Sequence, residues 1–143
     1  MSFDMKEWAE IQPLIKKSRE SIRRLFERHF ARFDHDAERK VGEIQTFLNV
    51  FRFITRKWTV EVLYELEIHE GLIFNDLKRH LGDISSRTLS DCLKELQNQG
   101  LIDRQVQDTH PPSVFYNLTE GGKGLIELSM LLIMFLADLQ LKK

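Results

Sequence analysis

The fold of this chain is decided by residues 57–122, which read KWTVEVLYELEIHEGLIFNDLKRHLGDISSRTLSDCLKELQNQGLIDRQVQDTHPPSVFYNLTEGG. In three segments of this stretch, apolar residues recur every three or four positions, as they do on one face of a helix. The residues with this spacing are Val60, Val62, Leu63 and Leu66, then Phe74, Leu77 and Leu81, and then Leu89, Leu93 and Leu96. Gly71, Gly82 and Gly100 end the three segments. The stretch therefore predicts a helix, a short helix and a third helix in succession.

The start of the third segment is well marked. Ser85 is a favourable N-cap, and Ile84 before it can pack against Leu89 as a hydrophobic staple. Together these contacts would fix the angle between the second and third helices. Two helices held at a fixed angle by a short turn are typical of a helix-turn-helix.

After Gly100 the pattern changes to that of a β-hairpin. Two short runs are rich in β-forming residues, namely Leu101, Ile102 and Val106, and then Val114, Phe115, Tyr116 and Leu118. Residues 108–113 join the runs, and Pro111 and Pro112 stiffen this tip. The whole order predicts a winged helix-turn-helix, in which the third helix enters the major groove of DNA and the hairpin is the wing.

Two amphipathic helices are expected before this core. The apolar face of the first consists of Trp8, Ile11, Ile15, Ile22, Leu25, Phe26, Phe30 and Phe33, and that of the second of Val41, Ile44, Phe47, Leu48, Phe51 and Ile54. Asp34, His35 and Asp36 interrupt the pattern between them. Pro13 marks either the first turn of a new helix or a kink, and a start is the preferred interpretation.

The last segment is expected to be a buried helix. Thr119 is its N-cap, although Gly121 and Gly122 weaken the first turn. Residues 125–141 are apolar on nearly every side, with Leu125, Leu128, Leu131, Leu132, Met134, Phe135 and Leu139. One small core cannot cover this helix and the aromatic-rich first helix as well. We therefore expect a homodimer.

The predicted fold class is mainly α with a small β-hairpin (α+β), a winged helix-turn-helix with additional N- and C-terminal dimerisation helices. Residues 1–54 are interpreted as an N-terminal helical extension for dimerisation, residues 55–122 as the DNA-binding core, and residues 123–143 as a C-terminal dimerisation helix. Which terminal helix dominates the dimer interface is left open.

Composition excludes several classes of protein. With 143 residues, 42% of them apolar and 30% charged, the chain can form one compact domain. A single cysteine, Cys92, rules out an intrachain disulfide and a multi-thiolate metal site. The first residues lack the pattern of a signal peptide, and the longest apolar run, residues 130–137, is shorter than the roughly 20 residues of a membrane span. We expect a cytoplasmic protein without membrane contact.

The charge gives no general signal for nucleic acid, because the net charge is −1. Its distribution is uneven: residues 14–40 carry nine Lys or Arg and five Asp or Glu, whereas residues 41–76 carry three and six. A local basic patch is therefore compatible with a neutral chain.

These residues resemble the HxlR family of prokaryotic winged-helix transcription regulators, which is similar to the broader MarR group. The resemblance extends over roughly residues 45–125. The matching residues are Lys57, Trp58, Phe74, Leu77, Ile84, Ser85, Leu89, Leu93, Leu96, Gly100, Leu101, Arg104, Pro111, Pro112, Val114, Tyr116, Leu118, Thr119 and Gly122. The resemblance implies a DNA-binding regulator of transcription.

Two positions depart from the pattern of that family. Gln45 occupies the place of a cysteine that family members use to sense aldehydes or oxidants, so no thiol sensor of that type is implied. Thr55 and Arg56 replace paired glycines before Lys57, which favours a continuous helix at this turn. The N-terminal extension of some 40 residues has no counterpart in the resemblance.

Candidate DNA-binding residues lie on three elements. They are Ser85, Ser86, Arg87, Thr88, Ser90 and Lys94 on or just before the recognition helix (residues 86–99), Lys78 and Arg79 on the preceding helix, and Arg104 and His110 on the wing (residues 102–118). Arg87 is the first choice for reading bases, because arginine makes a bidentate contact to guanine. Lys78 and Arg79 suit phosphates, and the wing residues suit the minor groove or its flanking backbone. Asp91 disfavours phosphate, unless it pairs with Arg87 or Lys94.

Other chemistry is not indicated. Five histidines, His29, His35, His69, His80 and His110, show no paired spacing on a common face, so no metal site is predicted. No nucleotide-binding glycine loop or nucleophile elbow is recognisable, so neither catalysis nor a cofactor is expected. Cys92 is expected to be a small core residue and not a redox sensor.

The leading hypothesis is a homodimeric, sequence-specific DNA-binding transcription regulator. The alternative is a winged helix used for protein–protein interaction without DNA, which would explain the neutral charge, Asp91 on the reading face and a wing tip without Lys or Arg. A small-molecule effector stays open, since no convergent polar residues mark a pocket for one.

Overall fold

The computed structural model describes residues 5–32 and 36–141. Phe33, Asp34 and His35, which were assigned to the first helix face or to the interruption after it, lie outside the described residues. The chain forms two compact units. One unit is Val50–Ile133, and the other is Met1–Asn49 with Met134–Lys143.

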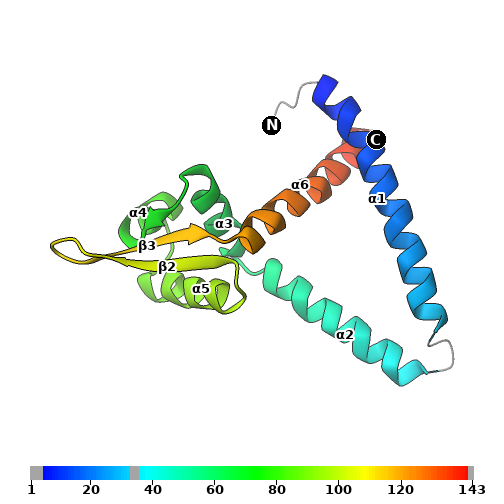
Figure 1. Ribbon diagram of the computed structural model, residues 1–143, viewed down its shortest axis with the longest axis horizontal. Coiled ribbons are helices and arrows are strands. Elements are labelled where there is room, and N and C mark those ends of the chain that lie inside the picture. Colours follow the sequence, from blue (N-terminus) through cyan, green and yellow to red (C-terminus); the bar gives the residue numbers. More distant parts are fainter. Residues whose placement is uncertain (1–4, 33–35, 142–143) are drawn as a thin grey trace. The chain divides into compact units, whose positions relative to one another are not determined.

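The first unit has the predicted order of elements (Figure 1). Three helices and a three-stranded sheet precede the start of the last helix. The elements are α3 (Thr59–Ile68), β1 (Leu72–Ile73), α4 (Phe74–Leu81), α5 (Ser86–Asn98), β2 (Ile102–Gln107), β3 (Ser113–Leu118) and α6 (Glu120–Leu141). Helices α3 and α4 pack against β3, whereas α5 packs against β2. The predicted mainly α fold with a β-hairpin is confirmed.

The sheet contains one strand that the sequence did not predict. Its order is β1-β3-β2 and both pairings are antiparallel, with Leu72 opposite Tyr116 and Ile102 opposite Leu118. A strand of two residues is too short to show a period, and its partner lies more than 40 positions away. The pairing ties the entrance of α4 to the wing.

The core of this unit combines the apolar helix faces that the spacing predicted with residues of the two hairpin strands. Its buried residues are Val62, Leu63, Leu66, Leu77, Ile84, Leu89, Leu93, Leu96, Ile102, Tyr116, Leu118 and Ile126. Val60 was also placed near the inner face, but it is 37% exposed. Thr59, one residue earlier, is buried in its place, so the buried stripe of α3 begins there.

Both predicted helix caps are present. The Ser85 hydroxyl accepts a hydrogen bond from the Thr88 amide at 3.0 Å, and the Thr119 hydroxyl accepts one from the Gly122 amide at 3.1 Å. Packing also requires glycine at position 122, because a Cβ there would overlap the carbonyl oxygen of Leu101. The glycine that weakens the first turn of α6 therefore lets the helix approach the wing closely.

The junction before α3 differs from the prediction. Helix α2 (Ala37–Ile54) ends before Thr55, so the helix is not continuous through this turn. Trp58 adopts a left-handed conformation with φ of 80°. This conformation costs on the order of 1 kcal/mol for a residue with a side chain. The left-handed position is Trp58 and neither Thr55 nor Arg56, the two residues that replace the paired glycines.

The second unit is built on α1 (Met5–Ala31), together with most of α2 and the last turns of α6. Pro13 lies inside α1, so the preferred helix start at this residue is wrong. Contacts that lie on both sides of Pro13 hold the helix. Gln12 donates to Asp138 at 3.2 Å, and the Arg19 guanidinium lies 5.1 Å from the centre of the Phe135 ring.

Many apolar side chains of α1, α2 and α6 stay exposed in the single chain. They include Leu14, Ile22, Leu25, Val41, Ile44, Phe47, Leu48, Phe51, Leu128, Leu132, Leu136 and Leu139. The apolar sequence of α6 suggests a helix that is covered on all sides. In the single chain, α6 is not covered in this way. None of the helices within the described residues is long and apolar enough to cross a membrane.

Candidate nucleic-acid interface

Helix α5 presents two chemically different faces. Leu89, Leu93 and Leu96 are at most 2% exposed and hold the helix against the core. The opposite face is polar and exposed, and it carries Ser86, Arg87, Ser90, Asp91 and Lys94. One accessible surface, which starts at the N-terminus of α5, therefore carries six of the candidate residues: Ser85, Ser86, Arg87, Thr88, Ser90 and Lys94.

The N-terminus of α5 is electrostatically suited to an anion. Its first turn contains no acidic residue, and the positive end of the helix dipole lies there. Ser85 is engaged in the cap, since it also donates to the Thr88 hydroxyl at 2.8 Å. Arg87 makes no hydrogen bond or ion pair with any described residue. Its guanidinium is therefore available to an external partner.

The candidates on α4 differ in how available they are. Lys78 is half-buried, while Arg79 is exposed and forms an ion pair with Asp76 at 2.7 Å. A phosphate at Arg79 would compete with this carboxylate, although exposed ion pairs contribute only about 0.2–1 kcal/mol. Lys78 has no such ion pair with a described residue, so its ammonium group is the more available of the two.

The wing carries Arg104 along β2 and His110 at its tip, and both are exposed. Residues 108–112 project beyond the ends of α4 and α5 in Figure 1. Hydrogen bonds order the tip, with the Thr109 hydroxyl donating to the Pro111 carbonyl at 2.9 Å and Ser113 donating to Gln107 at 3.0 Å. The structure thus sets His110 apart from the cluster on α5.

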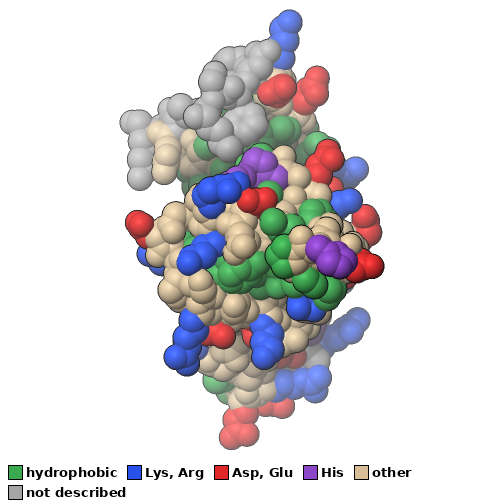
Figure 2. Space-filling view, turned by 90° about the vertical axis from the view of Figure 1, so that its left-hand side faces the viewer, with side chains coloured by type: hydrophobic (Ala, Val, Ile, Leu, Met, Phe, Trp, Pro, Cys, Tyr) green, Lys and Arg blue, Asp and Glu red, His purple; other side chains and the backbone are tan. Residues whose placement is uncertain are grey.

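Charges of both signs are dispersed over this side of the molecule. Figure 2 views it with the wing tip toward the reader, and Lys and Arg side chains lie at separate points around a hydrophobic area, with Asp and Glu among them. Asp91 does not pair with Arg87 or Lys94 within the described part of the chain, contrary to one interpretation of the sequence. The outward face of α5 therefore keeps a carboxylate beside its cations.

Cys92 lies at the edge of the core, as expected. Burial raises the pKa of its thiol from 9.0 to about 11, and the nearby Glu61 carboxylate adds to the rise. A thiol with a raised pKa is protonated at neutral pH and reacts slowly. This environment is the opposite of the one that a redox sensor needs.

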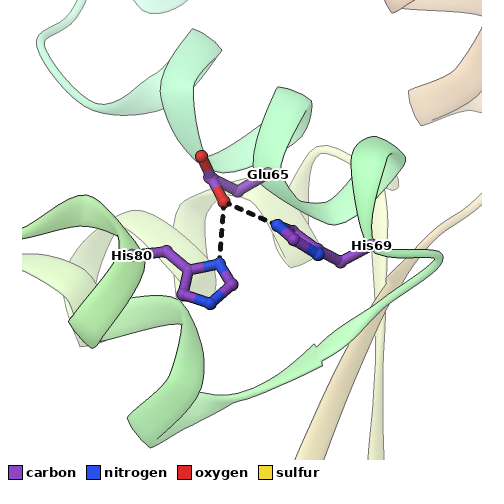
Figure 3. A group of neighbouring side chains, drawn as sticks. All are labelled: Glu65, His69 and His80. Carbon is purple, nitrogen blue, oxygen red and sulfur yellow. Dashed lines mark hydrogen bonds and ion pairs between the residues drawn. The ribbon is translucent and has the colours of Figure 1, made fainter.

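One cluster of polar side chains was not found from the sequence. Glu65, His69 and His80 converge from α3, from its C-cap and from the last turn of α4 (Figure 3). Glu65 and His69 have the i, i+4 spacing of one helix face, which was the available signal. His80 joins them only because α4 packs on α3.

Comparisons with known proteins place this geometry among transcription regulators. The HxlR-like helix-turn-helix family matches residues 53–140. An uncharacterised HTH-type transcriptional regulator of Halalkalibacterium halodurans is 36% identical over 91 residues, which cover 62% of this chain and 80% of that protein.

Solved structures agree with the sequence comparisons. A MarR-family regulator of Enterococcus faecalis superposes with a TM-score of 0.62 and 30% identity, covering 68% of this chain and 89% of that one. The redox regulator HypR in its reduced form gives a TM-score of 0.53 at 31% identity, covering 62% and 85%. The matched segment of the family contains α3 to β3 and nearly all of α6, and it leaves out α1 and most of α2.

Proposed function

The chain belongs to the HxlR-like helix-turn-helix family, and on that premise we propose that it is a homodimeric, sequence-specific DNA-binding regulator acting in the cytoplasm. Members of the family are transcription regulators and not enzymes. The observation that carries the proposal is the exposed polar face of α5, which begins at a capped N-terminus and on which Arg87 has no hydrogen-bond or ion-pair partner among the described residues.

Arg87 is assigned to base reading. An unpaired guanidinium in the first turn of a recognition helix can make two parallel hydrogen bonds to guanine, which are worth about 1–3 kcal/mol of discrimination. Ser86, Thr88 and Ser90 surround it with hydroxyls that suit phosphates or bases. Ser85 acts through the cap, because its hydroxyl already accepts from the Thr88 amide.

Phosphate contacts are assigned to the remaining candidates. Lys94 lies two turns after Arg87 on the same face, and Lys78 and Arg79 lie on α4. Arg104 and His110 would follow the minor groove or its backbone from the wing. Such contacts position the protein without reading the sequence, and they make its affinity fall as salt is added.

The homodimer is proposed from the apolar side chains that one chain leaves uncovered. Most of them lie on α1, α2 and α6, within residues 1–54 and 123–143, and exposed apolar side chains in this number are typical of an interface. A two-fold dimer places two recognition helices in successive major grooves, about 34–36 Å apart. The expected operator is therefore a pseudo-palindrome.

A second candidate function is a winged helix that binds another protein and not DNA. The unpaired Asp91 on the outward face of α5 favours it, because a carboxylate beside the groove repels phosphate. The net charge of −1 points the same way.

Fluorescence anisotropy separates the two candidates. The protein is titrated against duplex DNA from its own upstream region and against a scrambled duplex, each at two salt concentrations. A regulator binds the native duplex more tightly and loses affinity as salt rises. Equal, weak binding to both duplexes would favour the protein-binding alternative.

The variant Arg87→Ala sharpens this test. We expect it to reduce the preference for the native duplex by about ten- to a hundredfold, corresponding to about 1–3 kcal/mol. Lys123→Ala is the matched control, because it removes one exposed positive charge from α6, away from the recognition face. Loss of preference in both variants, or in neither, would contradict the role of Arg87.

A further inference from the structure

The three side chains of the cluster in Figure 3 point toward one another. Atom Oε2 of Glu65 lies 3.0 Å from Nδ1 of His80 and 3.4 Å from Nε2 of His69. One potential ligand atom from each residue lies within 4.8 Å of the other two. A single carboxylate oxygen is thus shared by two imidazole rings.

Two of the three separations are close to those around a tetrahedral metal ion. With bonds of about 2.0–2.2 Å, the ligand atoms of a tetrahedral zinc site lie roughly 3.3–3.6 Å from one another. The two measured separations, 3.0 and 3.4 Å, lie close to that range, so small rotations of the side chains would admit an ion. We propose that Glu65, His69 and His80 form a binding site for a divalent transition-metal ion of the Zn²⁺ class.

Hydrogen bonds and a metal ion would use the same atoms of this cluster. The ring centres of His69 and His80 are 4.5 Å apart, and a neutral imidazole at either position can donate one N–H to Oε2 of Glu65. A metal ion instead uses neutral imidazole nitrogens and an ionised carboxylate together. Each of the three groups then has a partner of the right charge.

The donor set selects the class of metal. Two imidazoles and one carboxylate suit Zn²⁺ and its neighbours, whereas Mg²⁺ and Ca²⁺ prefer oxygen ligands alone. Three protein ligands leave a fourth position open. The side chains of Glu65 and His80 are 27% and 28% exposed and border a pocket also lined by Trp58, Tyr64 and Leu81. A water molecule or a small ligand has room to complete the coordination.

The site would connect two helices of the winged core. Glu65 and His69 belong to α3 and its C-cap, and His80 belongs to α4, the first helix of the helix-turn-helix. An ion bound only by the folded chain raises its stability by mass action. Any effect of the metal on operator binding rests on the proposed function, but the binding of the metal does not.

The test uses the metal-free full-length protein without DNA. Zn²⁺ is titrated in competition with a chromophoric chelator, and Co²⁺ is added in a parallel experiment because its visible absorption reports tetrahedral coordination. We expect one ion per chain, a rise in the thermal midpoint, and no such response to Mg²⁺. His80→Ala and Glu65→Gln should each weaken Zn²⁺ binding about tenfold or more. Removing an outer-sphere partner of a bound metal has an effect of that size, and removing a direct ligand should have at least the same effect.

His29→Ala is the matched control. His29 contacts the carboxylate of Glu43 and belongs to no cluster of three ligand groups among the described residues. The His29→Ala variant should bind Zn²⁺ with the same affinity as the unaltered protein. Glu65→Gln keeps the shape of the side chain, so loss of binding in this variant with an unchanged fold by circular dichroism supports ligation. Absence of saturable binding, or equal affinity in all variants, would overturn the proposal and leave the DNA titration unaffected.

Discussion

The two units of this protein use apolar residues in different ways. In the winged core, Leu66, Leu89 and Leu96 are at most 1% exposed, and strands and helices surround them. In the terminal helices, Val41 and Phe47 are more than half exposed, and α2 contains no buried residue. The core is complete within one chain, whereas the apolar faces of the terminal helices stay exposed in the single chain. An apolar helix face in the sequence therefore predicts an apolar surface without saying whether the same chain covers it.

The strongest test of this difference is one substitution made in both units. Leu96→Ala should lower the free energy of unfolding by about 2–5 kcal/mol, because it leaves a cavity in a closely packed core. Leu48→Ala removes the same atoms from a side chain that is 43% exposed, and it should have a much smaller effect on the unfolding of the core. Urea denaturation followed by circular dichroism measures both. Equal losses would mean that the two units are packed alike.

The next test addresses the proposed dimer interface. Phe47→Glu should weaken self-association about ten- to a hundredfold, since burying a phenylalanine contributes about 1.5–3 kcal/mol. Gln45→Glu adds the same charge at an exposed polar position of α2 and is the control. Sedimentation equilibrium over a range of concentrations gives the dissociation constants. A protein that is monomeric before substitution would remove the basis for the comparison.

A smaller effect is expected at the start of α5. Ser85→Ala removes the hydrogen bond to the Thr88 amide and should cost about 1 kcal/mol of stability. Ser86→Ala, one residue later, removes a hydroxyl that does not cap the helix and should cost less than about 0.5 kcal/mol. Thermal unfolding of both variants checks the order. If Ser86→Ala is the more harmful, the cap is not what fixes the recognition helix.

At neutral pH the smallest effect on stability concerns the thiol. The pKa of Cys92 is raised to about 11, so the thiol adds no pH dependence to the free energy of unfolding below about pH 9. Between about pH 9 and 11 the unfolded chain ionises first, and the free energy of unfolding falls. At pH 8, iodoacetamide should modify Cys92 slowly in the folded protein and faster in urea.

A comparator for this reaction is available in the terminal helices. Gln45→Cys in a Cys92→Ser background places a thiol on the exposed surface of α2. It should react several times faster than Cys92, which lies beside the buried Leu89 and Leu93. Equal rates would show that the edge of the core is open to the reagent.

The sequence predicted most of the winged core because its signals there are local. Ser85, Thr119 and the glycines after each helix act within a turn of their own positions, and the buried leucines of α5 follow one period. The candidates on α5 were found in the same way, as the residues opposite those leucines. Pro13 and the turn at Trp58 were misjudged, because contacts distant in sequence hold α1 and because a bulky residue adopts a conformation typical of glycine.

The sequence by itself determined the order of elements, the caps, the buried face of each core helix and the family. Only the tertiary structure decided the pairing of β1 with β3, the exposure of the α2 aromatics and the meeting of His80 with Glu65 and His69. The physical reason is the distance along the chain over which each signal acts. Helical periodicity and capping depend on neighbours three or four positions apart, whereas these features depend on which elements pack together.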